Sequence, residues 1–80
     1  MRVNSLKELS VLIQNQRLKK DYSQNKVADL ASMRQATVSS FEANPANAKL
    51  ETLFKLLSAL DLELEVSPKG QGNSVSELDW

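Results

Sequence analysis

Residues 23–42, which read SQNKVADLASMRQATVSSFE, decide the fold of this chain. Ser23 is a favourable helix N-cap, and the apolar residues after it recur at helical spacing. They predict a short helix from Gln24 to about Ala31, whose inward side chains are Val27, Ala28, Leu30 and Ala31. Ser32-Met33 interrupts this pattern, so a tight turn is expected there.

A second short helix is predicted after the turn, from Gln35 to Ala43. Val38 and Phe41 are its expected inward residues, with Ala36 only marginally so. Two short helices on either side of a tight turn form the sharpest structural signal in the sequence.

The outer face of this second helix carries short polar side chains and no carboxylate before Glu42. Such a surface suits the major groove of DNA, where Gln bonds adenine bidentately, Arg bonds guanine, and Ser or Thr serves either. Ala36 and the methyl group of Thr37 can lie against a thymine methyl. The residues expected to read bases or the adjoining backbone are Arg34, Gln35, Ala36, Thr37, Ser39 and Ser40. An ordinary polar surface helix is the alternative that composition alone leaves open.

Gln24 and Lys26 lie at the start of the first of these helices. Backbone amides at a helix N-terminus attract anions, so these two residues are expected to contact DNA phosphates or to fix the orientation of the domain.

Two further helices flank the pair. Ser5 followed by Glu8 has the form of a capping box and predicts a helix that runs to about Lys20. Its expected inward residues are Leu6, Leu9, Leu12, Ile13 and Leu18. Pro45 places residues 44–47 in a loop. A fourth helix is predicted over 49–60, with a core stripe of Leu50, Leu53, Phe54, Leu57 and Leu60 and with Leu56 at its edge.

The hydrophobic period changes from helical to alternating at residues 61–66. Acidic residues at 61, 63 and 65 alternate with Leu62, Leu64 and Val66, which is the repeat of a half-buried strand. A lone strand in a helical chain leaves its backbone groups unpaired, and the same strand from a second subunit would pair them. We therefore expect a two-stranded antiparallel lid across the two-fold axis of a homodimer. A frayed extension of the fourth helix is the alternative.

Residues 67–80 are expected to form a flexible tail, separate from a DNA-binding and dimerisation domain at residues 1–66. The stretch from Lys69 to Ser74 is too polar to bury a core of its own. The tail carries Trp80 at its end. A large aromatic residue on a polar, flexible segment is suited to a segment that becomes ordered on a partner.

Composition narrows the classes of function. Eighty residues make one small domain, whose modest burial a second copy would increase. Because the chain has no Cys and no His, it lacks disulfides, thiolate metal sites, the commonest metal ligand and the commonest general base. We expect no enzymatic activity, no metal and no cofactor. No apolar run approaches the ~20 residues that cross a bilayer, and no signal peptide is evident, so a cytoplasmic protein without membrane association is expected.

The net charge of the chain is zero, but the charge is unevenly distributed. Residues 1–60 contain nine basic and five acidic residues, a net charge of +4. Residues 61–80 contain one basic and five acidic residues, a net charge of −4. A basic body with an acidic tail is the asymmetry expected when nucleic acid binds on one side. A solvated mixture of charges is the alternative.

Motifs in three of the helices share one register, that of the Cro/cI-like (XRE) helix-turn-helix family. They are Ser-Gln-Asn-Lys-Val-Ala at 23–28, Gln-Ala-Thr-Val-Ser-Ser-Phe-Glu at 35–42, and the leucine-rich stretch at 50–60. Over about residues 5–62 the chain resembles this family. The resemblance implies an all-α domain of four to five helices, and an ion pair between Arg17 and Glu42 that orients the reading helix. The family usually has Gly in the turn before that helix, where this chain has Ser32. A residue with a Cβ at positive φ costs about 1 kcal/mol.

Finer details resemble the HipB-type antitoxins, the DNA-binding halves of HipA–HipB toxin–antitoxin pairs. They are Arg-Gln-Ala-Thr-Val-Ser at 34–39, Phe-Glu-Ala-Asn-Pro at 41–45, the acidic segment after the fourth helix, and the ending Leu-Asp-Trp at 78–80. The resemblance implies a homodimer with a shared β-lid, bound to a palindromic operator upstream of its own operon in the bacterial cytoplasm, hence at the nucleoid. It also implies a HipA-like serine/threonine kinase toxin that the antitoxin holds inactive, with Leu78 and Trp80 as the expected tail contacts.

Two other readings stay open. A stand-alone dimeric repressor without a toxin partner leaves Trp80 and the acidic tail unexplained. A protein-only interaction module would keep the fold and bind no DNA, and the lack of acids on the outer face of the third helix disfavours it.

Overall fold

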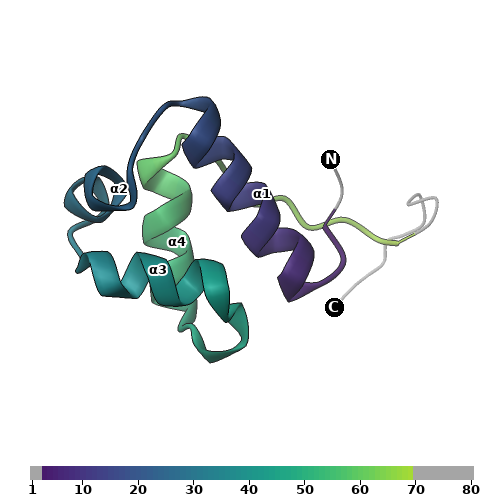
Figure 1. Ribbon diagram of the computed structural model, residues 1–80. Coiled ribbons are helices and arrows are strands. Elements are labelled where there is room, and N and C mark those ends of the chain that lie inside the picture. Colours follow the sequence, from purple (N-terminus) through teal and green to yellow (C-terminus); the bar gives the residue numbers. More distant parts are fainter. Residues whose placement is uncertain (1–2, 70–80) are drawn as a thin grey trace.

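The computed structural model describes residues 3–69, which fold into four α-helices and one short 3-10 helix (Figure 1). In chain order they are α1 (Leu6–Lys19), α2 (Gln24–Ala31), α3 (Gln35–Ala43), the 3-10 helix η1 (Pro45–Asn47) and α4 (Leu50–Ala59). α3 packs against α1 and α2, and α2 also packs against α4. The all-α, four-helix class expected from the sequence is therefore present, and the predicted 44–47 loop contains η1.

Serine side chains begin α1 and α2. The hydroxyl of Ser5 accepts a hydrogen bond from the backbone N–H of Glu8 at 3.1 Å, and the Glu8 carboxylate accepts one from the backbone N–H of Asn4 at 2.7 Å. The hydroxyl of Ser23 accepts from the backbone N–H of Lys26 at 3.0 Å. Both predicted N-caps are confirmed, and they satisfy amides that the first turn of a helix leaves unpaired.

Three of the helices end in the same way, on a non-glycine residue with positive φ. The φ angles are 63° at Asp21 after α1, 57° at Ser32 after α2 and 59° at Asp61 after α4. The next residue then closes the helix by donating its backbone N–H to a carbonyl five residues back, at 2.8–3.0 Å. Asp and Ser here occupy the left-handed conformation that usually favours Gly, so the turn at Ser32 is retained without a glycine.

One hydrophobic core lies between the four helices. Its buried members are Ile13, Val27, Ala28, Val38, Phe41, Leu53, Leu56, Leu57 and Leu60. Leu9, Tyr22, Met33 and Leu62 pack partly buried against it. Each helix contributes one narrow apolar stripe to this core, which fixes the position of α3 against the other three helices.

Several residues predicted to face inward are exposed instead. On α1 the buried positions are Ser10, Ile13 and Arg17, and Arg17 pairs with Glu42 of α3. The expectation was wrong for Leu6, which lies in the first turn of α1, and for Leu18, which lies on another side of that helix. It was also wrong for Leu30 on α2, for Ala36 on α3, and for Leu50 and Phe54 on α4.

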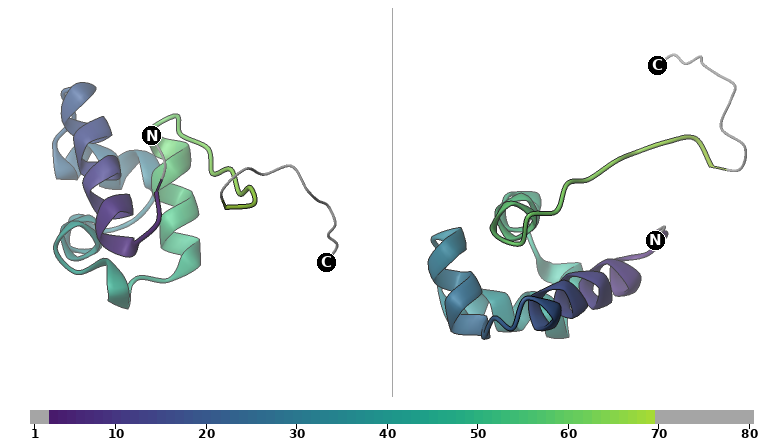
Figure 2. Two further views of the ribbon diagram at one scale, coloured as in Figure 1. Left: turned by 90° about the vertical axis from the view of Figure 1, so that its right-hand side faces the viewer. Right: turned by 90° about the horizontal axis from the view of Figure 1, so that it is seen from above.

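α4 carries a wider apolar surface than the rest of residues 3–69 covers. The fully buried Leu56 belongs to the side that faces the other helices, although its predicted place was the edge of the stripe. Viewed from above, the other three helices all lie on one side of α4, and only the segment after it extends on the other (Figure 2). Leu50 and Phe54 are 72% and 52% exposed.

The segment after α4 leaves the domain in extended form, and residues 62–69 belong to no helix or strand (Figure 2). The strand predicted at 61–66 is thus not formed in the single chain, because a strand requires a backbone partner and this segment has none among residues 3–69. Two contacts with α1 and the turn after it hold the start of this segment. The side-chain amide of Gln16 donates to the carbonyl of Leu60 at 3.2 Å, and Lys20 pairs with Asp61 at 3.0 Å. Leu62 is half-buried, whereas Leu64 and Val66 are 46% and 87% exposed. The lid remains a prediction about two copies.

Within residues 3–69, no helix is long and apolar enough to cross a membrane.

Replacing Leu56 by Ala tests the placement of the core. The Leu56 side chain is fully buried, so we expect the free energy of unfolding to fall by about 2–5 kcal/mol. The matched control is Leu18→Ala, which truncates a side chain that is 57% exposed and should cost less than about 0.5 kcal/mol. Urea denaturation followed by circular dichroism measures both. Equal losses in the two variants would contradict this core.

Candidate nucleic-acid interface

A short turn at Ser32, Met33 and Arg34 sets α3 against α2. The backbone N–H of Met33 closes α2 by donating to the carbonyl of Ala28 at 2.9 Å, and the Met33 side chain packs partly buried against the core. Arg34 then precedes α3 in extended conformation. Both the backbone N–H and the side chain of Met33 hold the turn in place, so the position of the start of α3 is fixed relative to α2.

A buried ion pair connects α3 to α1. Arg17 donates from Nε to one oxygen of Glu42 at 2.7 Å and from Nη2 to the other at 3.1 Å. The exposed fractions of the two side chains are 10% and 6%. Two parallel hydrogen bonds of this kind fix both distance and angle between the groups. Arg17 also donates from Nη1 to the carbonyl of Tyr22 at 2.9 Å, so one guanidinium connects α1, α3 and the turn before α2.

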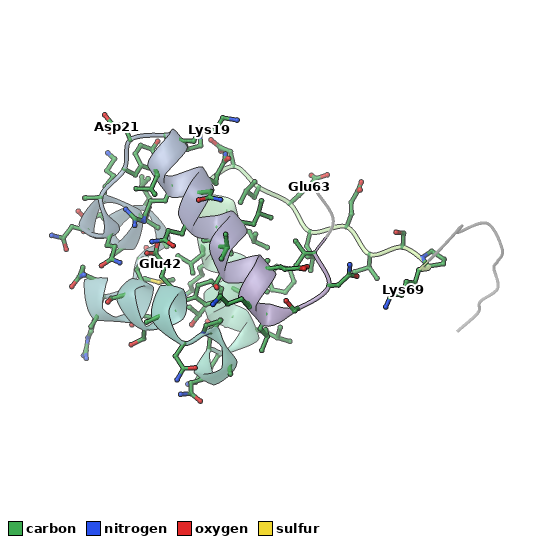
Figure 3. All side chains as sticks on the ribbon, turned by 45° about the vertical axis from the view of Figure 1, so that its right-hand side comes forward. Lys19, Asp21, Glu42, Glu63 and Lys69 are labelled. Atoms are coloured by element: carbon green, nitrogen blue, oxygen red, sulfur yellow. The ribbon has the colours of Figure 1, made fainter. Side chains whose placement is uncertain are left out.

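Hydrogen bonds continue from this ion pair to the first residue of α3. Gln24 donates from Nε2 to Glu42 at 3.0 Å, and its Oε1 accepts a hydrogen bond from Nε2 of Gln35 at 2.6 Å. We call this chain of side chains, from Arg17 through Glu42 and Gln24 to Gln35, the glutamine relay. It runs from the interior of the domain to its surface, since Glu42 lies between the helices (Figure 3) and Gln35 is exposed.

The glutamine relay fixes which way each amide points. An ionised carboxylate only accepts, so Gln24 must turn its NH₂ group towards Glu42 and its carbonyl towards Gln35. Gln35 must then use one N–H on Gln24, which leaves its own carbonyl oxygen and its second N–H free. One acceptor and one donor are the pair that a Gln presents to the edge of adenine.

The structure places the predicted base-reading residues on one exposed helix and its N-cap. Arg34, Gln35, Ala36 and Ser40 are exposed, and Thr37 and Ser39 are half-buried. Glu42 is the one carboxylate of α3, and it is engaged by Arg17 and Gln24. The outer surface of α3 therefore carries no free negative charge that would repel an approaching anion.

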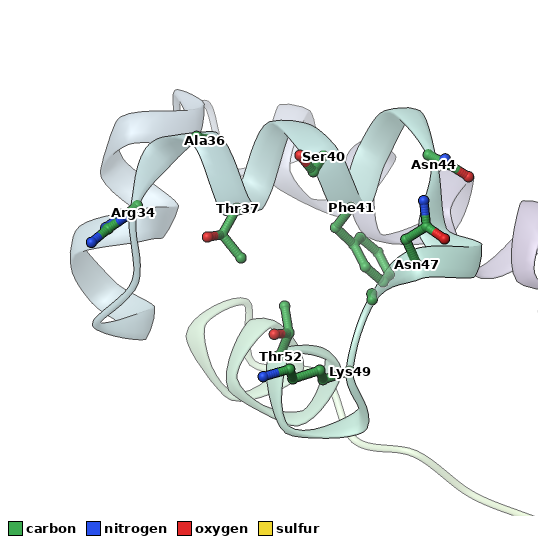
Figure 4. Close-up of a pocket in the computed structure, with 10 residues that line it drawn as sticks. Arg34, Ala36, Thr37, Ser40, Phe41, Asn44, Asn47, Lys49 and Thr52 are labelled. Atoms are coloured by element: carbon green, nitrogen blue, oxygen red, sulfur yellow. The ribbon is translucent and has the colours of Figure 1, made fainter.

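An open groove runs between α3 and the start of α4 (Figure 4). Its volume is about 410 Å³, and the side chains of Thr37 and Thr52 point towards one another from its two walls. The polar and charged residues that line it are Arg34, Thr37, Ser40, Asn44, Asn47, Lys49 and Thr52. The last four of these were not among the predicted site residues, because Asn44 and Asn47 read as part of a connection between helices, and Lys49 and Thr52 as part of the fourth helix. Their polarity was the available signal.

Basic side chains lie near the start of α2. Lys20 and Lys26 both lie close to the ring of Tyr22, with Nζ atoms 5.9 and 5.8 Å from its centroid. The hydrogen bond and the negative charge of Asp61 raise the pKa of Lys20 above its ordinary value. Lys26 is exposed next to the N-terminus of α2, where a phosphate could approach.

Leu78 and Trp80, the predicted toxin contacts, lie outside the described residues. Gln24 was expected to contact phosphate or to fix the orientation of the domain, and its side-chain amide bonds Glu42 and Gln35. The sequence alone could not show this, because Gln24 and Gln35 meet only once the turn has folded.

Replacing Glu42 by Gln tests the ion pair from which the relay starts. The Arg17 guanidinium would remain buried beside a neutral amide, so we expect the free energy of unfolding to fall by about 3 kcal/mol. The matched control is Glu51→Gln, which removes an exposed pair with Lys55 at 3.7 Å and should cost less than about 0.5 kcal/mol. Denaturant titration measures the free energy of unfolding of both variants. A small loss at Glu42, equal to that at Glu51, would show that the ion pair does not hold α3.

Known proteins share both this sequence and this arrangement of helices. The Helix-turn-helix family model matches residues 13–66. Antitoxin HipB of Escherichia coli O6:H1 is 33% identical over 63 residues, which cover 74% of this chain and 67% of that relative. A solved structure described as "Structure of HipA-HipB-O2-O3 complex" superposes with a TM-score of 0.84 at 30% identity, over 88% of this chain and 99% of the other. The "HipB-O4 20mer complex" gives the same values. The chain therefore belongs to the helix-turn-helix family and, within it, to the HipB-type antitoxins.

Proposed function

We propose that this chain is a DNA-binding antitoxin and transcriptional autorepressor of a toxin–antitoxin operon. It binds a palindromic operator as a dimer, and it binds and neutralises a HipA-like serine/threonine kinase toxin. The glutamine relay is the observation that carries the proposal, because it holds Gln35, with one acceptor and one donor free, on an exposed helix whose single carboxylate is already engaged.

In this proposal α3 enters the major groove. Gln35 bonds the edge of adenine with its free carbonyl oxygen and N–H, and Arg34 bonds guanine or the adjoining backbone. Thr37, Ser39 and Ser40 supply adaptable hydroxyl groups, and Ala36 offers a methyl group to thymine. Because Gln35 is already held in the free protein, little side-chain freedom is lost when it binds.

Phosphate contacts flank the reading helix on both sides. Lys26 lies near the N-terminus of α2, and Lys49 lies across the groove at the start of α4. Gln24 stabilises the reading helix through the relay. Such contacts set the position of the protein on the duplex, and base contacts set the sequence that it prefers.

The proposal that this chain binds a toxin rests on its family membership and on the composition of residues 67–80. A HipB relative has been solved in a complex that also contains HipA. We assign residues 67–80 to a tail separate from the domain at residues 1–66, with Leu78 and Trp80 as the toxin contacts. The protein then acts in the cytoplasm, on the nucleoid, by binding alone and without a reaction of its own.

A stand-alone repressor or a protein-only module would share the fold. The groove, and the absence of any carboxylate on α3 other than the engaged Glu42, favour a DNA-binding role over the second of these.

A salt titration on the duplex upstream of the gene tests DNA binding, with a scrambled duplex as control. We expect a preference for the native duplex of about 10³-fold or more, with affinity that falls steeply as salt rises. Gln35→Ala should then lose about 1–3 kcal/mol against the preferred base only. The control Asn15→Ala removes an amide from the exposed face of α1 and should change nothing. Equal and weak binding to both duplexes would favour the protein-only module.

Deleting residues 67–80 tests the division of the chain. We expect operator affinity to be unchanged and binding of the HipA-like kinase from the same operon to be lost, because the tail then holds only toxin contacts. Trp80→Ala should reproduce most of the loss, and Ser76→Ala should not. Calorimetry with each partner measures both effects. Loss of operator binding on deletion would contradict this division.

A further inference from the structure

The glutamine relay has a buried end and an exposed end, and hydrogen-bond donation runs from the exposed end inward. Glu42 accepts from Arg17 at both carboxylate oxygens and has no donor to offer. Nε2 of Gln24 donates to Glu42 at 3.0 Å, and Oε1 of Gln24 accepts from Nε2 of Gln35 at 2.6 Å. The buried carboxylate therefore sets the direction of both hydrogen bonds.

Neither amide of the relay can turn over without losing a hydrogen bond. A rotated Gln24 would place its carbonyl against the carboxylate of Glu42, and a rotated Gln35 would place its carbonyl against that of Gln24. Two acceptors would then face each other where a hydrogen bond is now formed. An unsatisfied acceptor at a half-buried position such as that of Gln24 is costly, so one orientation of the Gln35 amide is strongly preferred.

An amide held in one orientation reads fewer base edges than a free one. A free Gln can face a base with its carbonyl or with both N–H groups. Gln35 has one N–H engaged by Gln24, so it offers one acceptor and one donor. Adenine presents the complementary pair in the major groove, an N6 donor and an N7 acceptor, whereas guanine presents two acceptors, O6 and N7. Guanine would therefore set its O6 against the Gln35 carbonyl.

A methyl group on N6 of adenine removes the donor that this carbonyl requires. One hydrogen of the N6 amino group pairs with thymine, and the other faces the major groove. In a methylated duplex the methyl group takes the place of the groove-facing hydrogen, because the pairing hydrogen is retained. The Gln35 carbonyl would then meet a methyl group, and its hydrogen bond to Gln24 hinders the amide from moving aside.

We propose that Gln24 is a specificity-determining positioning residue, and that N6-methylation of the adenine read by Gln35 lowers the affinity of the protein for its operator. The inference rests on the proposed function in that Gln35 reads an adenine of the operator. It goes further, because operator binding then depends on a chemical modification of the DNA that leaves the base sequence unchanged.

A substitution series on the native duplex first locates the adenine. Each A·T pair is replaced by G·C in both half-sites, and fluorescence anisotropy gives the Kd of each duplex. At the contacted pair, the replacement should weaken binding of the wild type by about 10- to 100-fold and that of Gln35→Ala by less than about twofold.

The methyl group is then tested at that adenine and, as a control, at an adenine whose replacement has no effect. We expect N6-methylation to raise the Kd of the wild type by about tenfold or more at the contacted adenine, and by less than about twofold at the control. Gln35→Ala should bind methylated and unmodified duplexes equally, because no carbonyl then faces the methyl group.

Gln24→Met tests the positioning role, because it keeps the length of the side chain and removes both of its hydrogen-bonding groups. Gln35 can then turn both N–H groups towards guanine, so the preference for A·T over G·C should fall to about threefold at the contacted pair only. The penalty for the methyl group should fall as well. The control Asn15→Ala, at an exposed position on α1, should leave both ratios unchanged.

A measurement without DNA isolates the relay itself. In the free wild type, the NMR order parameter of the Gln35 side-chain Nε2 should be near 0.8, roughly that of rigid backbone, and it should fall below about 0.6 in Gln24→Met. The exposed side-chain amide of Asn15 is the internal reference and should stay below about 0.6 in both proteins.

Three results would overturn the proposal: equal affinity of the wild type for methylated and unmodified operator, an unchanged preference for A·T in Gln24→Met, or a Gln35 amide as mobile as that of Asn15. Failure of the proposed function has a different signature. The native duplex would then be bound no better than the scrambled one, before any base is modified, and the inference would fall with it.

Discussion

The ion pair between Arg17 and Glu42 is the interaction on which the other features of this domain depend. It places a positive and a negative charge in the interior of a domain of four short helices, where isolated charges are strongly disfavoured. Both charges are satisfied: the guanidinium uses three N–H groups on Glu42 and on the carbonyl of Tyr22, and the carboxylate also accepts from Gln24. A pair of this kind contributes little net stability compared with apolar packing, but it specifies one arrangement of the helices. Here that arrangement presents α3.

The relay extends this specification from the helices to a single side chain. An exposed Gln normally samples several rotamers and either orientation of its amide. Gln35 is restricted because Gln24 can offer only its carbonyl once its NH₂ group is held by Glu42. The exposed surface at the start of α3 is therefore organised by a charge about two side chains away from it, and Gln24 belongs to the interior network as much as to the surface.

Much of this fold could be predicted from the sequence, because its helices begin and end on local signals. Ser5 and Ser23 marked two helix starts, and both caps are formed. The core stripe of α4 was predicted in part, with Leu53, Leu57 and Leu60 buried as expected. The periodicity could not show that α1 turns Arg17 inward at the expense of Leu18, since Arg17 pairs there with Glu42, a residue 25 positions away. It also could not separate the apolar residues of α4 that face the core from Leu50 and Phe54, which do not. The hydrogen bonds of Gln24 were out of reach for the same reason: they join residues that only the folded turn brings together.

In the proposed mode of DNA binding, the contact between Gln24 and Gln35 also constrains how such a protein can change its preferred DNA sequence over evolution. Nε2 of Gln35 donates to the side-chain carbonyl of Gln24 at 2.6 Å. A substitution that removes the amide of residue 35 therefore leaves this carbonyl without its donor. A residue at position 35 whose side chain only accepts hydrogen bonds would place a second acceptor against that carbonyl. New specificities are thus reached most readily by joint changes at positions 24 and 35, and homologues that have diverged in operator sequence should show covariation between the two helix starts.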